Sequence, residues 1–107
     1  MRPSKKRKLQ QAGFKVGTVQ EFLGLSDEEM ALIELKVRLV GMLRQVRQAR
    51  GLRQQDLADL ISSSQSRIAK IEAGDADVSL DLICKALFSM GVSRQQLART
   101  IGSKRAA

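Results

Sequence analysis

The pattern of apolar and polar positions between Gly51 and Gly74 predicts two short helices joined by a tight turn. Apolar residues recur there at helical spacing in two groups, and three consecutive serines separate the groups. The apolar positions are Leu52, Leu57, Ile61, Ile68 and Ile71. Ala58 supplies the small residue that two closely crossing helices need where they touch. This spacing indicates a helix-turn-helix.

The second of these helices is expected to begin at Gln65, with Ser64 as its N-cap. Ile68 and Ile71 would face the core, so the polar residues would form an outer face. That outer face consists of Gln65, Ser66, Arg67, Ala69 and Lys70. An amphipathic helix with such a face fits the major groove of DNA.

Two capping-box spacings near the N-terminus predict two further helix starts, at Thr18 to Glu21 and at Ser26 to Glu29. The first helix would end near Gly24. The second would run from about Asp27 to Arg50, where Gly51 stops it. The apolar positions of this long helix cover more than one stripe: they are Met30, Leu32, Ile33, Leu35, Val37, Leu39, Val40, Met42, Leu43 and Val46.

This wide apolar coverage means that the long helix contacts something besides the helix-turn-helix core. One interpretation is an N-terminal helix that folds back as a lid on the same chain. The other is a docking surface for a second subunit or for another protein. We favour docking, because exposed apolar patches of several hundred Å² usually mark interfaces.

These signals divide the chain into four segments. They are a basic flexible tail (residues 1–17), an N-terminal helical extension (18–39), a helix-turn-helix domain (40–101) and a flexible C-terminal end (102–107). The basic residues of the tail are Arg2, Lys5, Lys6, Arg7, Lys8 and Lys15, and no acid lies among its first fifteen residues. The tail could stay solvated, contact phosphates or the minor groove, or become ordered on a protein partner.

The charge balance favours a polyanionic partner. The 107 residues contain 19 Lys and Arg against 11 Asp and Glu, and the formal net charge is +8. No apolar run approaches the roughly 20 residues that a membrane span needs, and no signal-peptide segment follows the basic start. We therefore expect double-stranded DNA as the partner, and a cytoplasmic protein that associates with the nucleoid through DNA. RNA is less favoured, because Tyr and Trp are absent and only three Phe could stack on bases.

The sequence offers little catalytic chemistry. It has no His, one Cys and no paired carboxylates facing a glycine-rich loop, so no nucleophile can be paired with a base. We expect no enzyme activity, no cofactor and no metal site. Asp75, Asp77 and Asp81 are poorly spaced for a metal loop and suit helix capping instead. Cys84 lies beside an apolar stripe and is interpreted as a packing residue, with a redox switch as the alternative.

The direction in which side chains project from the paired helices assigns the DNA contacts. The expected base contacts are Gln65, Ser66, Ala69 and Lys70. Gln65 can offer a bidentate amide to adenine, Lys70 can donate to guanine, and the Ala69 methyl can meet a thymine methyl. The expected phosphate contacts are Gln54, Arg67, Arg53, Arg47, Arg50 and Ser64. Each of these side chains could instead be a solvated polar group. Glu72 is expected to form a structural ion pair with Arg44 or Arg47.

The same stretch resembles the Xre/Cro/CI family of helix-turn-helix repressors over residues 40 to 98. The residues that carry the resemblance are Gly51, Leu52, Gln54, Leu57, Ala58, Ser64, Ile68, Ile71, Glu72 and Gly74. It implies an all-α fold, a five-helix helix-turn-helix domain with the N-terminal extension and basic disordered tail added to it. Arg53, Ser62 and Ser63 depart from the family pattern. A Ser at positive φ costs on the order of 1 kcal/mol relative to Gly, so the turn is either strained or differently shaped.

One such domain makes about half of the contacts that a specific operator needs, so a homodimer on a pseudo-palindromic site is expected. The two-fold interface could use the C-terminal helix predicted from Ser93 to Ile101, with neighbouring residues before it. The candidate interface residues are Phe88, Met90, Leu97, Ala98 and Ile101. The N-terminal helices are the competing site.

The segment from Phe22 to Glu29, ahead of a domain of this type, resembles HigA-type antitoxins. That resemblance implies a sequence-specific repressor that autoregulates its operon as the antitoxin of a type II toxin-antitoxin pair. It also implies a partner toxin similar to RelE and HigB ribonucleases. The alternative is a stand-alone Xre-family or phage-type transcriptional regulator without a toxin partner.

Overall fold

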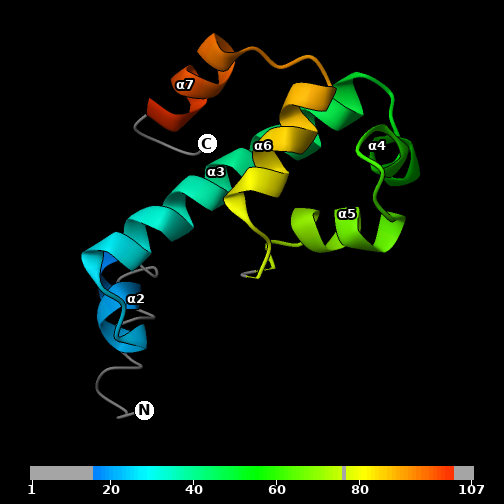
Figure 1. Cartoon of the computed structure of the whole chain (residues 1–107). Coiled ribbons are helices and arrows are strands. Elements are labelled where there is room, and N and C mark those ends of the chain that lie inside the picture. Colours follow the sequence, from blue (N-terminus) through cyan, green and yellow to red (C-terminus); the bar gives the residue numbers. More distant parts are fainter. Residues whose placement is uncertain (1–15, 76, 103–107) are drawn as a thin grey trace. The chain divides into compact units, whose positions relative to one another are not determined.

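The structure, a computed structural model, describes residues 16–75 and 77–102. The expectations for residues 1–15 of the tail and for residues 103–107 fall outside these ranges. The described residues form six helices and no strand, which confirms the predicted all-α fold (Figure 1). The helices are α2 (Val16–Leu23), α3 (Asp27–Ala49), α4 (Gln54–Leu60), α5 (Gln65–Glu72), α6 (Leu80–Ser89) and α7 (Arg94–Gly102).

The chain divides into two compact units inside the long helix α3. Unit 1 ends at Ile33 and unit 2 begins at Glu34. Unit 2 therefore holds the C-terminal part of α3 and helices α4 to α7, which are the five helices expected for the helix-turn-helix domain. The functional boundary expected after Leu39 stays a prediction.

Unit 1 contains α2 and the start of α3, and one of its two predicted capping boxes is present. Ser26 N donates to Glu29 Oε1 at 2.8 Å, and Glu29 N donates to Ser26 Oγ at 3.0 Å. The bond from the Ser26 backbone, together with that from its side chain, lowers the pKa of Glu29. The predicted helix start at Thr18 is wrong, because α2 already includes Val16. The capping-box spacing is also compatible with a helix interior, so it marks a start only where the preceding residues leave the helix.

The core of unit 2 is formed by apolar residues from α3 to α6 and from the turn after α6. Its buried members are Leu39, Leu43, Leu57, Ala58, Ile61, Ile68, Ile71, Ile83, Ala86, Leu87, Met90 and Val92. Each fully buried Leu or Ile side chain contributes about 1.5 to 3 kcal/mol. Helix α7 adds only partly buried Leu97 to this core, and Arg38 Nη1 donates to the carbonyl oxygen of Ile101 at 3.1 Å.

Helices α2 to α6 all end in the same hydrogen-bonding arrangement, the Schellman motif. In each, the residue after the cap adopts positive φ. Four of these residues are glycines, with φ between 69° and 90°, and the fifth is Ser62, with φ of 53°. At that fifth end Ser63 N donates to the Ala58 carbonyl at 2.8 Å, and Ser62 N donates to the Asp59 carbonyl at 3.3 Å. The turn thus keeps the usual shape. Of the two expected alternatives, the strained backbone at Ser62 is the one observed.

Cys84 agrees with its interpretation as a packing residue. It lies on α6, is partly buried and packs against the core. Burial, and next the negative charge of Asp81, raise the pKa of its thiol. A thiol with a raised pKa is less nucleophilic at neutral pH, which argues against the redox alternative.

Candidate DNA-binding surface

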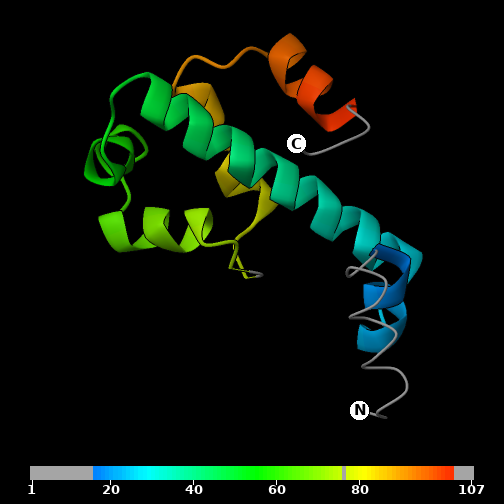
Figure 2. The same cartoon turned by 180° about the vertical axis from the view of Figure 1, so that it is seen from behind.

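Helices α4 and α5 form the predicted helix-turn-helix. Ser64 caps α5, since its Oγ accepts a hydrogen bond from Arg67 N at 3.2 Å. Ile68 and Ile71 face the core and are fully buried, and Ala58 on α4 is buried as well. Figures 1 and 2 show α5 at the margin of unit 2, where no other helix of that unit covers its far side. A nucleic acid can therefore reach the outer face of α5.

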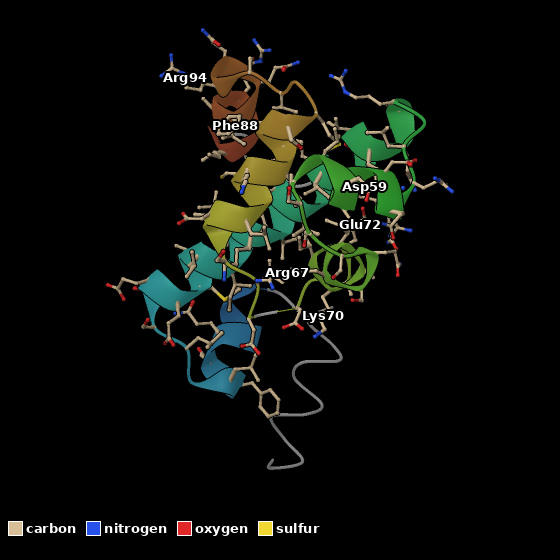
Figure 3. All side chains as sticks on the ribbon, turned by 45° about the vertical axis from the view of Figure 1, so that its right-hand side comes forward. Asp59, Arg67, Lys70, Glu72, Phe88 and Arg94 are labelled. Carbon is tan, nitrogen blue, oxygen red and sulfur yellow. The ribbon has the colours of Figure 1, made fainter. Side chains whose placement is uncertain are left out.

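The outer face of α5 carries the predicted base contacts. Gln65, Ser66, Arg67 and Lys70 are exposed, whereas Ala69 is half-buried. Figure 3 shows Glu72 between α4 and α5, while Arg67 and Lys70 extend from other sides of α5. Polar atoms are thus available on the outer face, and the Ala69 methyl is less accessible than expected.

A chain of hydrogen bonds holds the side chain of Gln65 in one orientation. Gln65 Nε2 donates to Gln54 Oε1 at 2.7 Å, and Gln54 Nε2 donates to Glu72 Oε1 at 3.2 Å. Glu72 is an acceptor when ionised, which fixes which end of the Gln54 amide faces it. Gln54 must then offer its oxygen to Gln65. The Gln65 amide keeps its own oxygen and one N–H, the pair that matches the N6 and N7 edge of adenine.

Glu72 is the inner end of this chain and forms the expected ion pair, with Arg47. Arg47 Nη2 donates to Glu72 Oε1 at 2.9 Å, Arg47 Nε donates to Glu72 Oε2, and Arg47 Nη1 donates to the Leu52 carbonyl at 2.7 Å. The two side chains are only 11% and 5% exposed. Burial opposes the charged form of Glu72, but the hydrogen bonds from Arg47 and Gln54 outweigh it and lower the pKa of the carboxyl.

The geometry argues against the predicted phosphate contact of Arg47. All three types of guanidinium nitrogen are used within the fold, and the side chain is nearly buried. Arg47 therefore links α3 to Glu72 and to the Leu52 carbonyl, and we leave it out of the proposed phosphate contacts. Sequence spacing placed Arg47 near the interface but did not show that Glu72 would occupy it.

Two other predicted phosphate contacts have protein neighbours of their own. Arg53 Nη2 and Asp56 Oδ1 form an exposed ion pair at 2.9 Å, which raises the pKa of Arg53 and lowers that of Asp56 to about 2. Asp56 Oδ2 also accepts the backbone N–H of Arg53 at 2.8 Å, which is the reciprocal half of a capping box, while the Arg53 side chain offers no acceptor to the helix. The guanidinium of Arg50 lies beside Gly91, so a methyl group added at the Gly91 Cα would lie within about 4 Å of it.

A half-open groove of about 320 Å³ runs along α5 on the side of the α5–α6 turn. It is lined by Ser64, Ser66, Arg67, Lys70, Asp75, Asp77, Val78 and Leu82. Four of these are predicted DNA contacts. The two acids were expected only to cap a helix, and their place beside Arg67 and Lys70 follows from the path of the turn, which sequence periodicity does not reveal.

The described residues contain no group of three or more His, Cys, Asp or Glu that could hold a metal ion. Among them, no helix is long and apolar enough to cross a membrane.

A helix-turn-helix with an uncovered, polar second helix is the DNA-binding module of transcription regulators. The family model described as helix-turn-helix matches residues 43–87, from α3 through most of α6. This match supports a DNA-binding transcription regulator, a class that is typically not enzymatic. No curated protein and no solved structure matches the chain.

Proposed function

We propose that the protein is a sequence-specific transcriptional repressor that places α5 in the major groove of DNA. The observation that carries the proposal is the fixed orientation of Gln65, which Gln54 and the buried Glu72 hold with the edge that suits adenine outward. Lys70 donates to guanine, and Ser66 and Ala69 complete the base contacts. A good bidentate contact is worth about 1 to 3 kcal/mol of discrimination against a wrong base.

Phosphate contacts on either side of α5 position the helix. Arg67 and Ser64 line the groove at the α6 side, and Arg53 lies just before the start of α4, while Gln54 orients Gln65. Arg50 supplies charge near the end of α3. Contacts of this kind fix orientation and carry no sequence information of their own.

The repressor acts as a homodimer on a pseudo-palindromic operator, with the two α5 helices about 34 Å apart. Phe88 and Ile101 are 44% and 42% exposed, and Ala98 is exposed too, so these residues can form a two-fold contact. Met90 is 4% exposed and already belongs to the core, which removes it from the expected interface. Leu97 is partly buried and contributes less than its position suggested.

The proposal is tested by titrating a duplex of the protein's own upstream promoter, and a scrambled duplex, with the full chain. The wild type should prefer the promoter by a hundredfold or more, in the range of specific binders. The double variant Gln65→Ala, Lys70→Ala should bind both duplexes alike. The matched control, Lys85→Ala with Gln95→Ala, removes the same residue types from exposed positions on α6 and α7 and should keep the preference. Equal binding of both duplexes by the wild type would overturn the proposal.

A second candidate function, an antitoxin that also binds a basic toxin, is favoured by the surface of unit 1. Phe22, Leu23, Leu32 and Ile33 are between 38% and 58% exposed. Residues 16–33 contain four acids and no base, which suits a partner with a basic surface around an apolar groove. Co-expression with the product of a neighbouring reading frame should yield a complex that Leu23→Glu with Leu32→Glu disrupts. If no complex forms, the stand-alone regulator is the better description.

A further inference from the structure

Arg44 on α3 carries a positive charge that the fold itself does not use. The sequence offered Arg44 and Arg47 as partners of Glu72, and Arg47 is the one that forms the ion pair. Arg44 is exposed, and it makes no hydrogen bond or ion pair with the part of the chain that the structure describes. Its guanidinium is therefore free to bind an anion from outside.

The position of Arg44 on α3 directs this charge toward α5. Residues three apart on a helix are neighbours, with Cβ atoms about 5 to 6 Å apart, and Arg47 reaches Glu72 at the end of α5. Burial raises the pKa of Glu72, whereas the hydrogen bonds from Arg47 and Gln54, and then the charges of Arg47 and Arg44, lower it. Arg44 thus lies close enough to Glu72 for their charges to interact.

This junction of α3 and α5 borders the proposed base-reading side chain. The amide of Gln54 bonds to Glu72 with one end, at 3.2 Å, and to Gln65 with the other, at 2.7 Å. A single glutamine amide therefore separates Gln65 from Glu72. The major groove is only about 12 Å wide, so groups at that separation from a base contact lie toward one of the phosphate strands that border the groove.

The charges at this border favour a phosphate only because of Arg44. Alone, the carboxylate of Glu72 would repel the DNA backbone, and the ion pair with Arg47 neutralises it. Arg47 has no nitrogen type left over, since its Nη1 donates to the Leu52 carbonyl. Arg44 adds a cation that no acid cancels, and a guanidinium can give a phosphate two parallel hydrogen bonds.

We propose that Arg44 makes the phosphate contact that the sequence had predicted for Arg47, on the strand beside the start of α4. The inference rests on the proposed DNA-binding function and adds a positioning residue to it. A phosphate contact fixes the orientation of α5 and carries no sequence information. Its physical signature is counterion release: each neutralised phosphate contributes about 0.9 to the slope of log affinity against log salt concentration.

The test compares Arg44→Gln with Arg94→Gln, a matched control that removes the same charge from an exposed position on α7. Figure 3 shows Arg94 far from Arg67 and Lys70. Gln is a good helix former, so both full-length variants should fold, and their melting temperatures check this. Binding to the promoter duplex and to the scrambled duplex is measured from about 50 to about 200 mM salt.

We expect Arg44→Gln to weaken binding to both duplexes and to lower the salt slope by about 0.9 for each bound copy of the chain. The ratio between the two affinities should stay at the wild-type value. Arg94→Gln should keep the wild-type slope. Arg44→Lys should keep the slope as well, because the charge is retained, but should bind less tightly than the wild type because an ammonium cannot form the two parallel bonds.

A wild-type salt slope for Arg44→Gln would overturn the proposal. If that variant also loses the preference for the promoter, Arg44 acts through Glu72 and Gln54 on the orientation of Gln65 instead. Equal losses of slope for Arg44→Gln and Arg94→Gln would overturn it too, because net charge alone would then explain the affinity. The proposed readout fails separately, when the wild type shows no preference for the promoter, and the slopes on the scrambled duplex still test Arg44 in that case.

Discussion

Gln65 donates a hydrogen bond from Nε2 to Oε1 of Gln54 across 2.7 Å, and this bond joins the first residue of α5 to the first residue of α4. The amide that is proposed to read adenine is thus aligned before DNA arrives. A side chain that is already ordered loses less conformational entropy on binding than a free one. The relationship makes Gln54 a positioning residue for the proposed readout.

Gln54→Ala should weaken binding to the promoter roughly 5- to 10-fold, the value of about one hydrogen bond. Binding to the scrambled duplex should change little. In a double-mutant cycle, Gln54→Ala should have almost no further effect once Gln65 is Ala, because the two residues act together. Gln55→Ala is the control, since this neighbouring glutamine bonds to the exposed Asp59 instead. Additive losses of binding free energy in the cycle would show that Gln54 contributes to DNA binding independently of Gln65.

Arg47→Ala should destabilise the protein by about 3 kcal/mol, because it leaves the carboxylate of Glu72 buried without its partner. Urea denaturation followed by circular dichroism measures this loss. Arg53→Ala breaks the ion pair with Asp56, which is exposed, and should leave the unfolding midpoint nearly unchanged. Similar losses for the two variants would mean that burial does not determine the strength of these pairs.

Acid should destabilise the wild type partly through Glu72. Its pKa is lower in the folded than in the unfolded protein, so the folded state is favoured above the unfolded value, about 4.3, and this advantage is lost as the pH falls through the folded value. Glu72→Gln should therefore lose less stability between pH 7 and pH 3 than the wild type. Melting temperatures across this range give the comparison.

Asp56 and Glu29 also have lowered pKa values, so both proteins will retain some acid sensitivity. The informative quantity is the difference between the two pH profiles. Parallel profiles for wild type and Glu72→Gln would show that the ion pair with Arg47 does not contribute to the pH dependence.

Ser62→Gly should stabilise the protein by about 1 kcal/mol, because Gly adopts positive φ without the contact between Cβ and the backbone. For a domain of this size, that corresponds to a rise of roughly 4 to 8 °C in melting temperature. Ser63→Gly is the matched control: its φ is not positive, so it should gain nothing and lose some stability through chain entropy. A fall in melting temperature for Ser62→Gly would mean that the serine side chain contributes more than its backbone strain costs.

Phe88→Glu should shift the protein from dimer to monomer in sedimentation, if α6 and α7 form the two-fold contact. Because the Phe88 side chain is 44% exposed, the folded monomer can place the Glu carboxylate in solvent. Leu32→Glu tests the competing contact in unit 1. If Leu32→Glu dissociates the dimer and Phe88→Glu leaves it intact, the interface lies on the N-terminal helices.

The sequence predicted the helix-turn-helix well because its signals are local. Ser64 caps α5, Ile68 and Ile71 fill the core, and Ser26 forms its capping box as periodicity and spacing indicated. These features depend on residues three or four apart. The Thr18 spacing failed because Val16 and Gly17, which precede it, are already part of the helix.

Long-range partners were harder to predict. The sequence narrowed the partner of Glu72 to Arg44 or Arg47, and only the packing of α3 against α5 chose Arg47. The bond between Gln54 and Gln65 spans eleven positions and depends on how α4 and α5 cross. The position of Asp75 and Asp77 beside Lys70 depends on the path of the segment between α5 and α6. The spacing of apolar residues does not encode that path.

Arg47 connects three parts of unit 2, because its own helix α3, the carbonyl of Leu52 and the carboxylate of Glu72 on α5 all meet at one guanidinium. This junction prevents α5 from tilting independently of α3. We therefore expect the helix-turn-helix to bind DNA without rearranging, so that the bending or twisting needed for a close fit comes from the DNA. Operators of equal base content but different deformability should accordingly bind with different affinity.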